Sequence, residues 1–158
     1  YIFSHIGYNI KPVELQAAMG RMQLKKVDGF IARRKKNFSL YERFFKHYEK
    51  YFILPKPMPK SDPSWFAYPL TIRKDAPFDR FTITNFLEEQ LIQTRPIFAG
   101  NILRQPGYKN IEYRKIGNLS NSDFTLTNSF FIGVYPAITD IQIDYITSTF
   151  KKFFKKYA

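Results

Sequence analysis

Cysteine is absent from this chain of 158 residues, and histidine occurs only 2 times. Without cysteine, these residues form no disulfide and hold no metal through thiolates. Protein zinc sites draw on several Cys and His ligands, so two histidines give no basis for a metal site. His5 and His47 also lie far apart in the sequence, and neither belongs to a Ser/His/Asp or Cys/His grouping. We therefore predict no metal site and no catalytic residue within this segment.

Long apolar runs are also missing. No stretch approaches the roughly 20 apolar residues that a membrane-spanning helix needs, so we predict no membrane insertion. Hydrophobic residues make up 44% of the chain and aromatic residues 18%, which indicates a folded globular protein about the size of one ordinary domain. The chain starts on Tyr1 within an aromatic-rich stretch, and we expect it to be a piece of a longer protein.

Acidic residues are scarce relative to basic ones, since 13 Asp and Glu stand against 25 Lys and Arg for a net charge of +12. A polyanionic partner is therefore one hypothesis. Two basic clusters, residues 33–36 and 151–156, lie in helical patterns, where such cations most often form a solvated face. No fold signature of nucleic-acid-binding proteins accompanies them. A basic module that binds nucleic acid or anionic membranes is thus the alternative from a different functional class.

Two helices are predicted in the first third of the chain. Pro12 and Glu14 suit a first helical turn, and Gly29 is expected to break or bend the helix. A second apolar stripe then predicts a helix of about five turns. The first stripe consists of Leu15, Ala18, Met19 and Met22, and the second of Phe38, Tyr41, Phe45, Tyr48 and Phe52.

The proline-rich segment "LPKPMPKSDPS", residues 54–64, cannot form regular structure. It predicts a connector between a loop and helix pair over residues 1–53 and a small domain over residues 65–158. Strands interleaved with helices, without an internal repeat, indicate an α/β or α+β sheet covered by helices. The expected strands are 65–73 (an edge or a bulge at Pro69), 92–96 and 130–136, and the expected helices begin at the capping residues Asp79, Ser120 and Thr139.

The stretch "TRPIFAGNILRQPGY", residues 94–108, concentrates polar side chains in a segment that is neither clean helix nor clean strand. Arg95 and Arg104 could bind phosphates through two hydrogen bonds each. Asn101 and Gln105 suit the hydroxyls of a sugar. A solvated surface loop is the equally weighted alternative.

Two further positions are candidates for ligand binding. Asn9, in "SHIGYNIKP", lies just before a predicted helix N-terminus, where amide donors and the helix dipole suit a phosphate. From the residues alone, helix capping by Asn9 is supported as well as phosphate binding. Trp65 could stack on a sugar or a base, although a role as a core anchor is favoured.

Four stretches together resemble the DegT/DnrJ/EryC1/StrS family of sugar aminotransferases and related dehydratases, which have the aspartate aminotransferase fold (fold type I). "SHIGYNIKPVELQAAMGRMQLKKVDGFIARRKKN" is similar to the helix pair that follows the family's active-site region. "SDPSWFAYPLTIR", "IQTRPIFAGNILRQP" and "NSFFIGVYPAIT" resemble the RfbH-like branch, which contains a CDP-4-keto-6-deoxy-D-glucose 3-dehydratase. Sugar aminotransferases usually carry a histidine where this chain reads Gly100-Asn101, so the loop favours the dehydratase branch.

The resemblance implies an α/β chain that forms the C-terminal part of a fold type I enzyme: a helix pair, linked to a large domain, and a small domain with a mainly antiparallel sheet. Such cytoplasmic enzymes use pyridoxamine 5′-phosphate to remove the 3-hydroxyl of a nucleotide-linked 4-keto sugar. The branch also carries a [2Fe-2S] cluster and receives electrons from a reductase. Its catalytic histidine and cluster ligands would lie upstream, and His5 matches neither.

The resemblance also implies a homodimer with shared active sites. Asn9 matches the asparagine that reaches the cofactor phosphate of the neighbouring subunit. With this resemblance, we interpret the 94–108 stretch as part of the nucleotide-sugar site. From the residue types we infer Arg95, Asn101, Arg104 and Trp65 as substrate-binding candidates. A pyridoxal 5′-phosphate-dependent sugar aminotransferase of the same fold is the nearest alternative.

Overall fold

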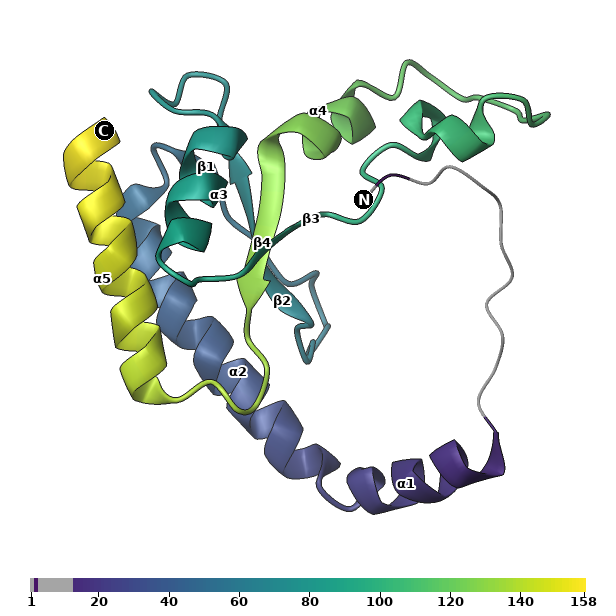
Figure 1. Cartoon of the computed structure of the whole chain (residues 1–158), viewed down its shortest axis with the longest axis vertical. Coiled ribbons are helices and arrows are strands. Elements are labelled where there is room, and N and C mark those ends of the chain that lie inside the picture. Colours follow the sequence, from purple (N-terminus) through teal and green to yellow (C-terminus); the bar gives the residue numbers. More distant parts are fainter. Residues whose placement is uncertain (1, 3–12) are drawn as a thin grey trace.

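The computed structural model describes residue 2 and residues 13–158. Within this part of the chain, the strands form one antiparallel sheet with the order β1-β2-β4-β3 (Figure 1). The predicted fold class, α/β with a mainly antiparallel sheet, is confirmed. The strands are β1 (Phe52–Ile53), β2 (Ala67–Ile72), β3 (Thr94–Pro96) and β4 (Ser129–Gly133).

Strand β2 contains a proline although it lies inside the sheet. It pairs with β4 along most of its length, with Leu70 opposite Phe130. Among the described strands, its other neighbour β1 reaches only Thr71 and Ile72. At Pro69, β2 therefore has β4 on one side only, and the strand is locally an edge where the proline sits, as its sequence predicts.

Helices cover one face of the sheet. The helices of the described residues are α1 (Glu14–Leu24), α2 (Val27–Phe45), α3 (Arg80–Glu89), α4 (Ser120–Asn128) and α5 (Asp140–Tyr157), with the 3₁₀ turns η1 (Lys46–Tyr48), η2 (Ile102–Arg104) and η3 (Pro106–Tyr108). Helices α2, α3 and α5 lie on the same side of the sheet (Figure 1). Phe45 of α2 illustrates the aromatic core between them, since its ring lies 5.3 Å from that of Tyr68 and 4.8 Å from that of Phe150.

Two of the predicted helix starts are confirmed with their capping bonds. Asp79 accepts a hydrogen bond of 2.8 Å from the Thr82 backbone N–H at the start of α3. Thr139 and Gln142 form a reciprocal capping box at the start of α5. These bonds join residues three positions apart, which is why the sequence alone reveals them.

Two local details differ from the predictions. The short helix predicted at Ser120 is present as α4, but Ser120 is its first residue rather than its cap, and the preceding Leu119 has a φ of 57°. The expected box fails because the carboxylate of Asp123 instead accepts hydrogen bonds from side chains of the 94–108 stretch. Gly29 lies within α2. The break between the first two helices occurs at residues 25–26, where the Lys26 backbone N–H donates to the Gln23 carbonyl at 2.9 Å.

One hydrophobic core contains residues from both sides of the proline-rich connector. Tyr41 of α2, which precedes the connector, and Tyr68 of β2, which follows it, are both fully buried, with their rings 5.6 Å apart. Strand β1 also precedes the connector and joins the sheet. The division at residues 54–64 stays a prediction, and the packing shows that α2 belongs to the same core as the sheet.

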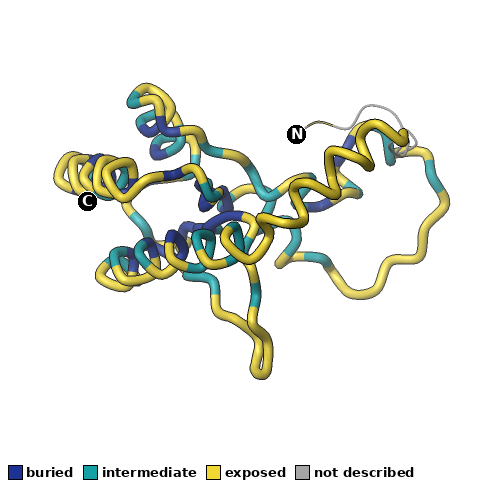
Figure 2. Tube along the Cα trace, turned by 90° about the horizontal axis from the view of Figure 1, so that it is seen from below, coloured by how far each residue is buried: buried dark blue, intermediate teal, exposed yellow. Residues whose placement is uncertain are grey.

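Helix α1 projects away from the sheet and its side chains are exposed throughout (Figures 1 and 2). Its predicted apolar face consists of Leu15, Met19 and Met22, which are 74%, 64% and 55% exposed. Nothing in the described residues covers this face. Exposed apolar patches commonly mark interaction surfaces.

Candidate functional site

The 94–108 stretch is folded by its own amide side chains. Asn101 is buried, and its Oδ1 accepts a hydrogen bond from the Leu103 backbone N–H at 3.1 Å. Its Nδ2 donates to Asp123 Oδ1 at 2.7 Å. Gln105 is also buried and donates through Nε2 to the Ala99 carbonyl at 3.2 Å. The two amides therefore shape the loop, and a contact of Asn101 with substrate stays a prediction.

Gly100 allows the loop to approach α4 closely. Its φ is 61°, and a Cβ at this position would lie 2.6 Å from the Leu126 Cα. Only glycine satisfies both the left-handed backbone and the close approach. The Gly-Asn pair is thus the point where the loop is fixed to α4: the glycine by contact and Asn101 by its hydrogen bond to Asp123.

Arg104 forms a bidentate ion pair with Asp123. Its Nε lies 2.9 Å from Oδ1 and its Nη2 lies 2.7 Å from Oδ2. The hydrogen bonds from Arg104, and then from Asn101, lower the pKa of Asp123 to about 2. The pKa of Arg104 is correspondingly raised by Asp123. The fork that could hold a substrate phosphate is therefore occupied within the chain, so substrate binding by Arg104 would require it to leave or share Asp123.

Arg95 has a different environment. It is exposed on β3, and it forms no ion pair with the residues that the structure describes. With the Gln93 amide oriented so that its oxygen faces the guanidinium, that oxygen accepts from Arg95 Nη2 at 2.7 Å. Of the two arginines, Arg95 is thus the one whose charge is not already neutralised, and it is the stronger candidate for an anionic ligand.

Trp65 is placed as a core anchor. Its ring stacks on Phe38 of α2, with centroids 4.5 Å apart and planes 6° from parallel. Arg34 donates from Nη1 to the carbonyl oxygens of Trp65 and Phe66, both at 3.1 Å. The structure therefore agrees with the favoured interpretation of Trp65 as a core anchor. Stacking of Trp65 on the substrate stays a prediction, and the contact with Phe38 makes such stacking less favourable.

Three phenylalanines form a cluster that the sequence reasoning missed, which we call the aromatic platform: Phe66, Phe98 and Phe131. The ring centroids lie 5.7 Å apart for Phe66 and Phe131, 6.2 Å for Phe98 and Phe131, and 6.2 Å for Phe66 and Phe98. The sequence contains one indication of this cluster. Phe131 stands between the core residues Phe130 and Ile132, and strand alternation places it on the opposite face of the sheet.

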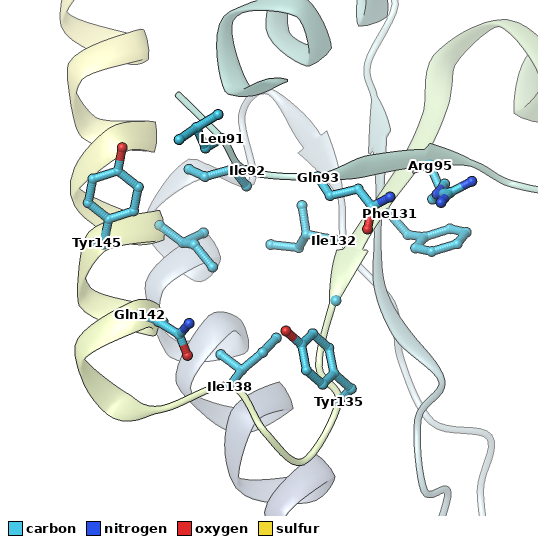
Figure 3. Close-up of a pocket in the computed structure, with 12 residues that line it drawn as sticks. Leu91, Ile92, Gln93, Arg95, Phe131, Ile132, Tyr135, Ile138, Gln142 and Tyr145 are labelled. Carbon is cyan, nitrogen blue, oxygen red and sulfur yellow. The ribbon is translucent and has the colours of Figure 1, made fainter. Parts of the chain in front are cut away.

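A cleft of about 290 Å³ lies between β4, α5 and the segment that enters β3 (Figure 3). Its polar groups largely serve the fold. Gln142 Oε1 accepts from the Thr139 N–H at 2.8 Å, and the Tyr145 hydroxyl donates to the Gln90 carbonyl at 3.0 Å. Figure 3 places Arg95 beside Phe131 at the far edge of this view. The cleft offers an apolar surface without a convergent set of catalytic groups.

The basic cluster at residues 33–36 is engaged within the chain. Arg33 and Lys36 form ion pairs with Asp140 at 2.8 and 2.7 Å, and Lys35 pairs with Asp62 at 2.5 Å. The pKa of Asp140 is lowered, chiefly by the hydrogen bond from Lys36 and then by Arg33. Since Arg34 holds backbone carbonyls, this cluster braces α2 against neighbouring segments rather than presenting a row of unpaired cations.

Asn9 lies outside the described residues, so its predicted contact with a cofactor phosphate stays a prediction. In the part of the chain that the structure describes, no group of three or more His, Cys, Asp or Glu side chains could hold a metal ion. Over the same residues, no helix combines the length and apolar character needed to cross a membrane.

Similarity to characterised proteins extends over nearly the whole chain. The lipopolysaccharide biosynthesis protein RfbH of Salmonella typhimurium is 42% identical over 154 residues, which cover 98% of this chain and 35% of RfbH. A dTDP-4-dehydro-2,6-dideoxy-D-glucose 3-dehydratase of Saccharopolyspora spinosa is also 42% identical, over 99% of this chain and 34% of that protein. The chain therefore spans about a third of the length of these relatives.

Solved structures of related enzymes have the same fold as this chain. Escherichia coli GDP-4-keto-6-deoxy-D-mannose-3-dehydratase with bound hydrated pyridoxal phosphate superposes with a TM-score of 0.80 at 30% identity, over 90% of this chain and 36% of that chain. Helicobacter pylori PseC, an aminotransferase, gives a TM-score of 0.79 at 21% identity, over 96% of this chain and 40% of that chain, and shows the shared fold. The predicted aminotransferase fold is thus confirmed. Residues 1–151 match the sequence model of the DegT/DnrJ/EryC1/StrS aminotransferase family, and the chain belongs to this family.

Proposed function

We propose that this chain is the C-terminal segment of a pyridoxamine phosphate-dependent nucleotide-sugar 3-dehydratase, acting on a CDP-4-keto-6-deoxyglucose type of substrate in deoxysugar and O-antigen lipopolysaccharide biosynthesis. The observation that carries the proposal is the contrast in identity within one fold. RfbH and a sugar 3-dehydratase are 42% identical to this chain. Among the solved structures, GDP-4-keto-6-deoxymannose 3-dehydratase is 30% identical, whereas the aminotransferases CalS13 and PseC and an aminotransferase of Brucella abortus are 19%, 21% and 14% identical.

The cofactor site itself depends on residues beyond those described. Pyridoxamine phosphate, when bound, supplies an amine that can react with a keto group and a ring that accepts electrons. Asn9 would hold the cofactor phosphate of the neighbouring subunit in a homodimer. The segment alone should be inactive, because the catalytic histidine and the [2Fe-2S] ligands would lie upstream.

The described residues support the substrate side of the proposal. Arg95 carries a charge that no carboxylate of the described residues neutralises, and it could meet the diphosphate of a nucleotide-sugar. The Arg104–Asp123 pair and the buried Asn101 fix the loop that follows Arg95. In this arrangement the loop residues position Arg95 and its surroundings, and the substrate contact is made from β3.

Product analysis with the complete enzyme tests the proposal. The enzyme is incubated with CDP-4-keto-6-deoxyglucose, pyridoxamine phosphate and an electron-donating reductase, and the sugar is identified by NMR. A sugar that lacks its 3-hydroxyl is the expected product. A 4-amino sugar formed at the expense of an amino donor would establish the alternative, a sugar aminotransferase. The upstream sequence gives a second test, because a lysine at the cofactor position favours transamination and a histidine with nearby cysteines favours dehydration.

A further inference from the structure

We propose that the aromatic platform, through the exposed rings of Phe66 and Phe98, stacks the nucleobase of the nucleotide-sugar. The inference rests on the proposed function and assigns a place to one part of its substrate. Phe66 and Phe98 are 66% and 57% exposed, whereas Phe131, whose ring contacts both, is 9% exposed. The two exposed rings therefore offer the surface on which a planar ligand can lie.

The backbone beneath both exposed rings is held in place. The carbonyl of Phe66 accepts a hydrogen bond from Arg34, and the adjacent Trp65 is stacked against the core. Phe98 donates its backbone N–H to the Pro96 carbonyl at 2.8 Å, and its φ of 44° is one that L-residues rarely adopt. Unfavourable backbone angles of this kind persist where the surroundings enforce them, often at ligand sites.

The charge beside the platform points to a nucleotide rather than to a neutral ring. Arg95 pairs with Phe131 across β3 and β4. Directly paired residues of an antiparallel sheet project from the same face, and Figure 3 shows the two side chains next to each other. An aromatic surface with an adjacent arginine fits a base joined to an anionic diphosphate, because the base can stack while the guanidinium meets phosphate oxygens.

The sizes of the rings and their spacing define how the base would bind. Centroids of Phe66 and Phe98 are 6.2 Å apart with planes inclined by 31°, which is too close for a base to enter between them as a third layer. The base would therefore lie over the outer side of one or both rings. Stacking of this kind tolerates different bases, so the platform would supply affinity more than discrimination among CDP, dTDP and GDP sugars.

Binding of nucleoside diphosphates to the complete enzyme tests the inference without depending on catalysis. Isothermal titration with CDP is performed on wild type and on the variants Phe66→Leu and Phe98→Leu, which keep an apolar side chain and remove the ring. We expect the Kd for CDP to rise about 5-fold or more in each variant, the loss of one base-stacking contact. Phe98→Tyr retains the ring and should retain the wild-type Kd.

Controls separate stacking from other effects. Phe81 is 72% exposed on α3, so Phe81→Leu makes the same change elsewhere and should leave the Kd unchanged. Binding of inorganic pyrophosphate should be unaffected by the platform variants. If the platform is instead covered by another part of the enzyme, Phe66→Leu and Phe98→Leu will lower Tm and leave the Kd for CDP unchanged, which overturns the inference alone. A wild-type enzyme that binds none of CDP, dTDP and GDP overturns the proposed function together with it.

Discussion

Replacing Arg95 with alanine in the complete enzyme should raise the KM for the nucleotide-sugar while leaving Tm unchanged. Arg95 is exposed and has no ion-pair partner among the described residues, so its removal strands no carboxylate and opens no cavity. Loss of one charge-assisted contact with a diphosphate predicts an increase in KM of about 10-fold, or ~1.4 kcal/mol.

The same change at Arg104 should have the opposite profile. Arg104 binds both carboxylate oxygens of Asp123, and Asp123 also receives the hydrogen bond of the buried Asn101. Arg104→Ala would therefore lower Tm by loosening the loop, with a smaller effect on KM. The structure thus assigns the stronger substrate effect to Arg95 and the stronger structural effect to Arg104.

Steady-state kinetics and thermal unfolding of both variants decide between these roles. Arg114→Ala provides a matched control, since it removes one exposed cation from the same region of the chain. A normal KM in Arg95→Ala, combined with a raised KM in Arg104→Ala, would refute the reasoning. A normal KM in both would show that the 94–108 stretch is structural and leaves the diphosphate to other residues.

Four further outcomes are expected. The pKa of Asp123 in the folded state, about 2, lies below its ordinary value of 3.8. The carboxylate therefore contributes stability above about pH 4, and this contribution is lost as the pH falls toward 2. In Asp123→Asn, Tm should depend less on pH in that range. Gly100→Ala should destabilise the fold by about 1–3 kcal/mol in denaturant unfolding, because its Cβ would meet Leu126 at a left-handed backbone position, and an unchanged midpoint would contradict the close approach. The chain by itself should self-associate and bind apolar dyes through the α1 face, Met19→Glu should reduce both in sedimentation and dye assays, and a dye-silent monomer would argue against an unpartnered face. Asn9→Ala in the complete enzyme should weaken cofactor retention by ~1–3 kcal/mol in an equilibrium titration, whereas unchanged affinity in a folded variant would remove Asn9 from the cofactor site.

Local features were readable from the sequence because their determinants lie within a few residues of one another. Asp79 and Thr139 cap helices through bonds to residues three positions later, and the α2 stripe of Phe38, Tyr41 and Phe45 follows helical periodicity. Pro69 correctly indicated a local edge. The family was readable for a related reason, since its motifs are continuous stretches of sequence.

The tertiary structure decided what each polar or aromatic side chain meets. Arg95 and Arg104 are both arginines and lie in one short segment, yet among the described residues Arg104 alone of the two pairs with a carboxylate, that of Asp123 on α4. Trp65 and Phe66 are adjacent, yet the first packs on Phe38 and the second faces outward. These outcomes depend on which segments the fold brings together, since Asp123 lies on α4 and Phe38 on α2. The sequence shows which side chains can form hydrogen bonds or stack. The partner of each side chain depends on packing between residues that are distant in the chain.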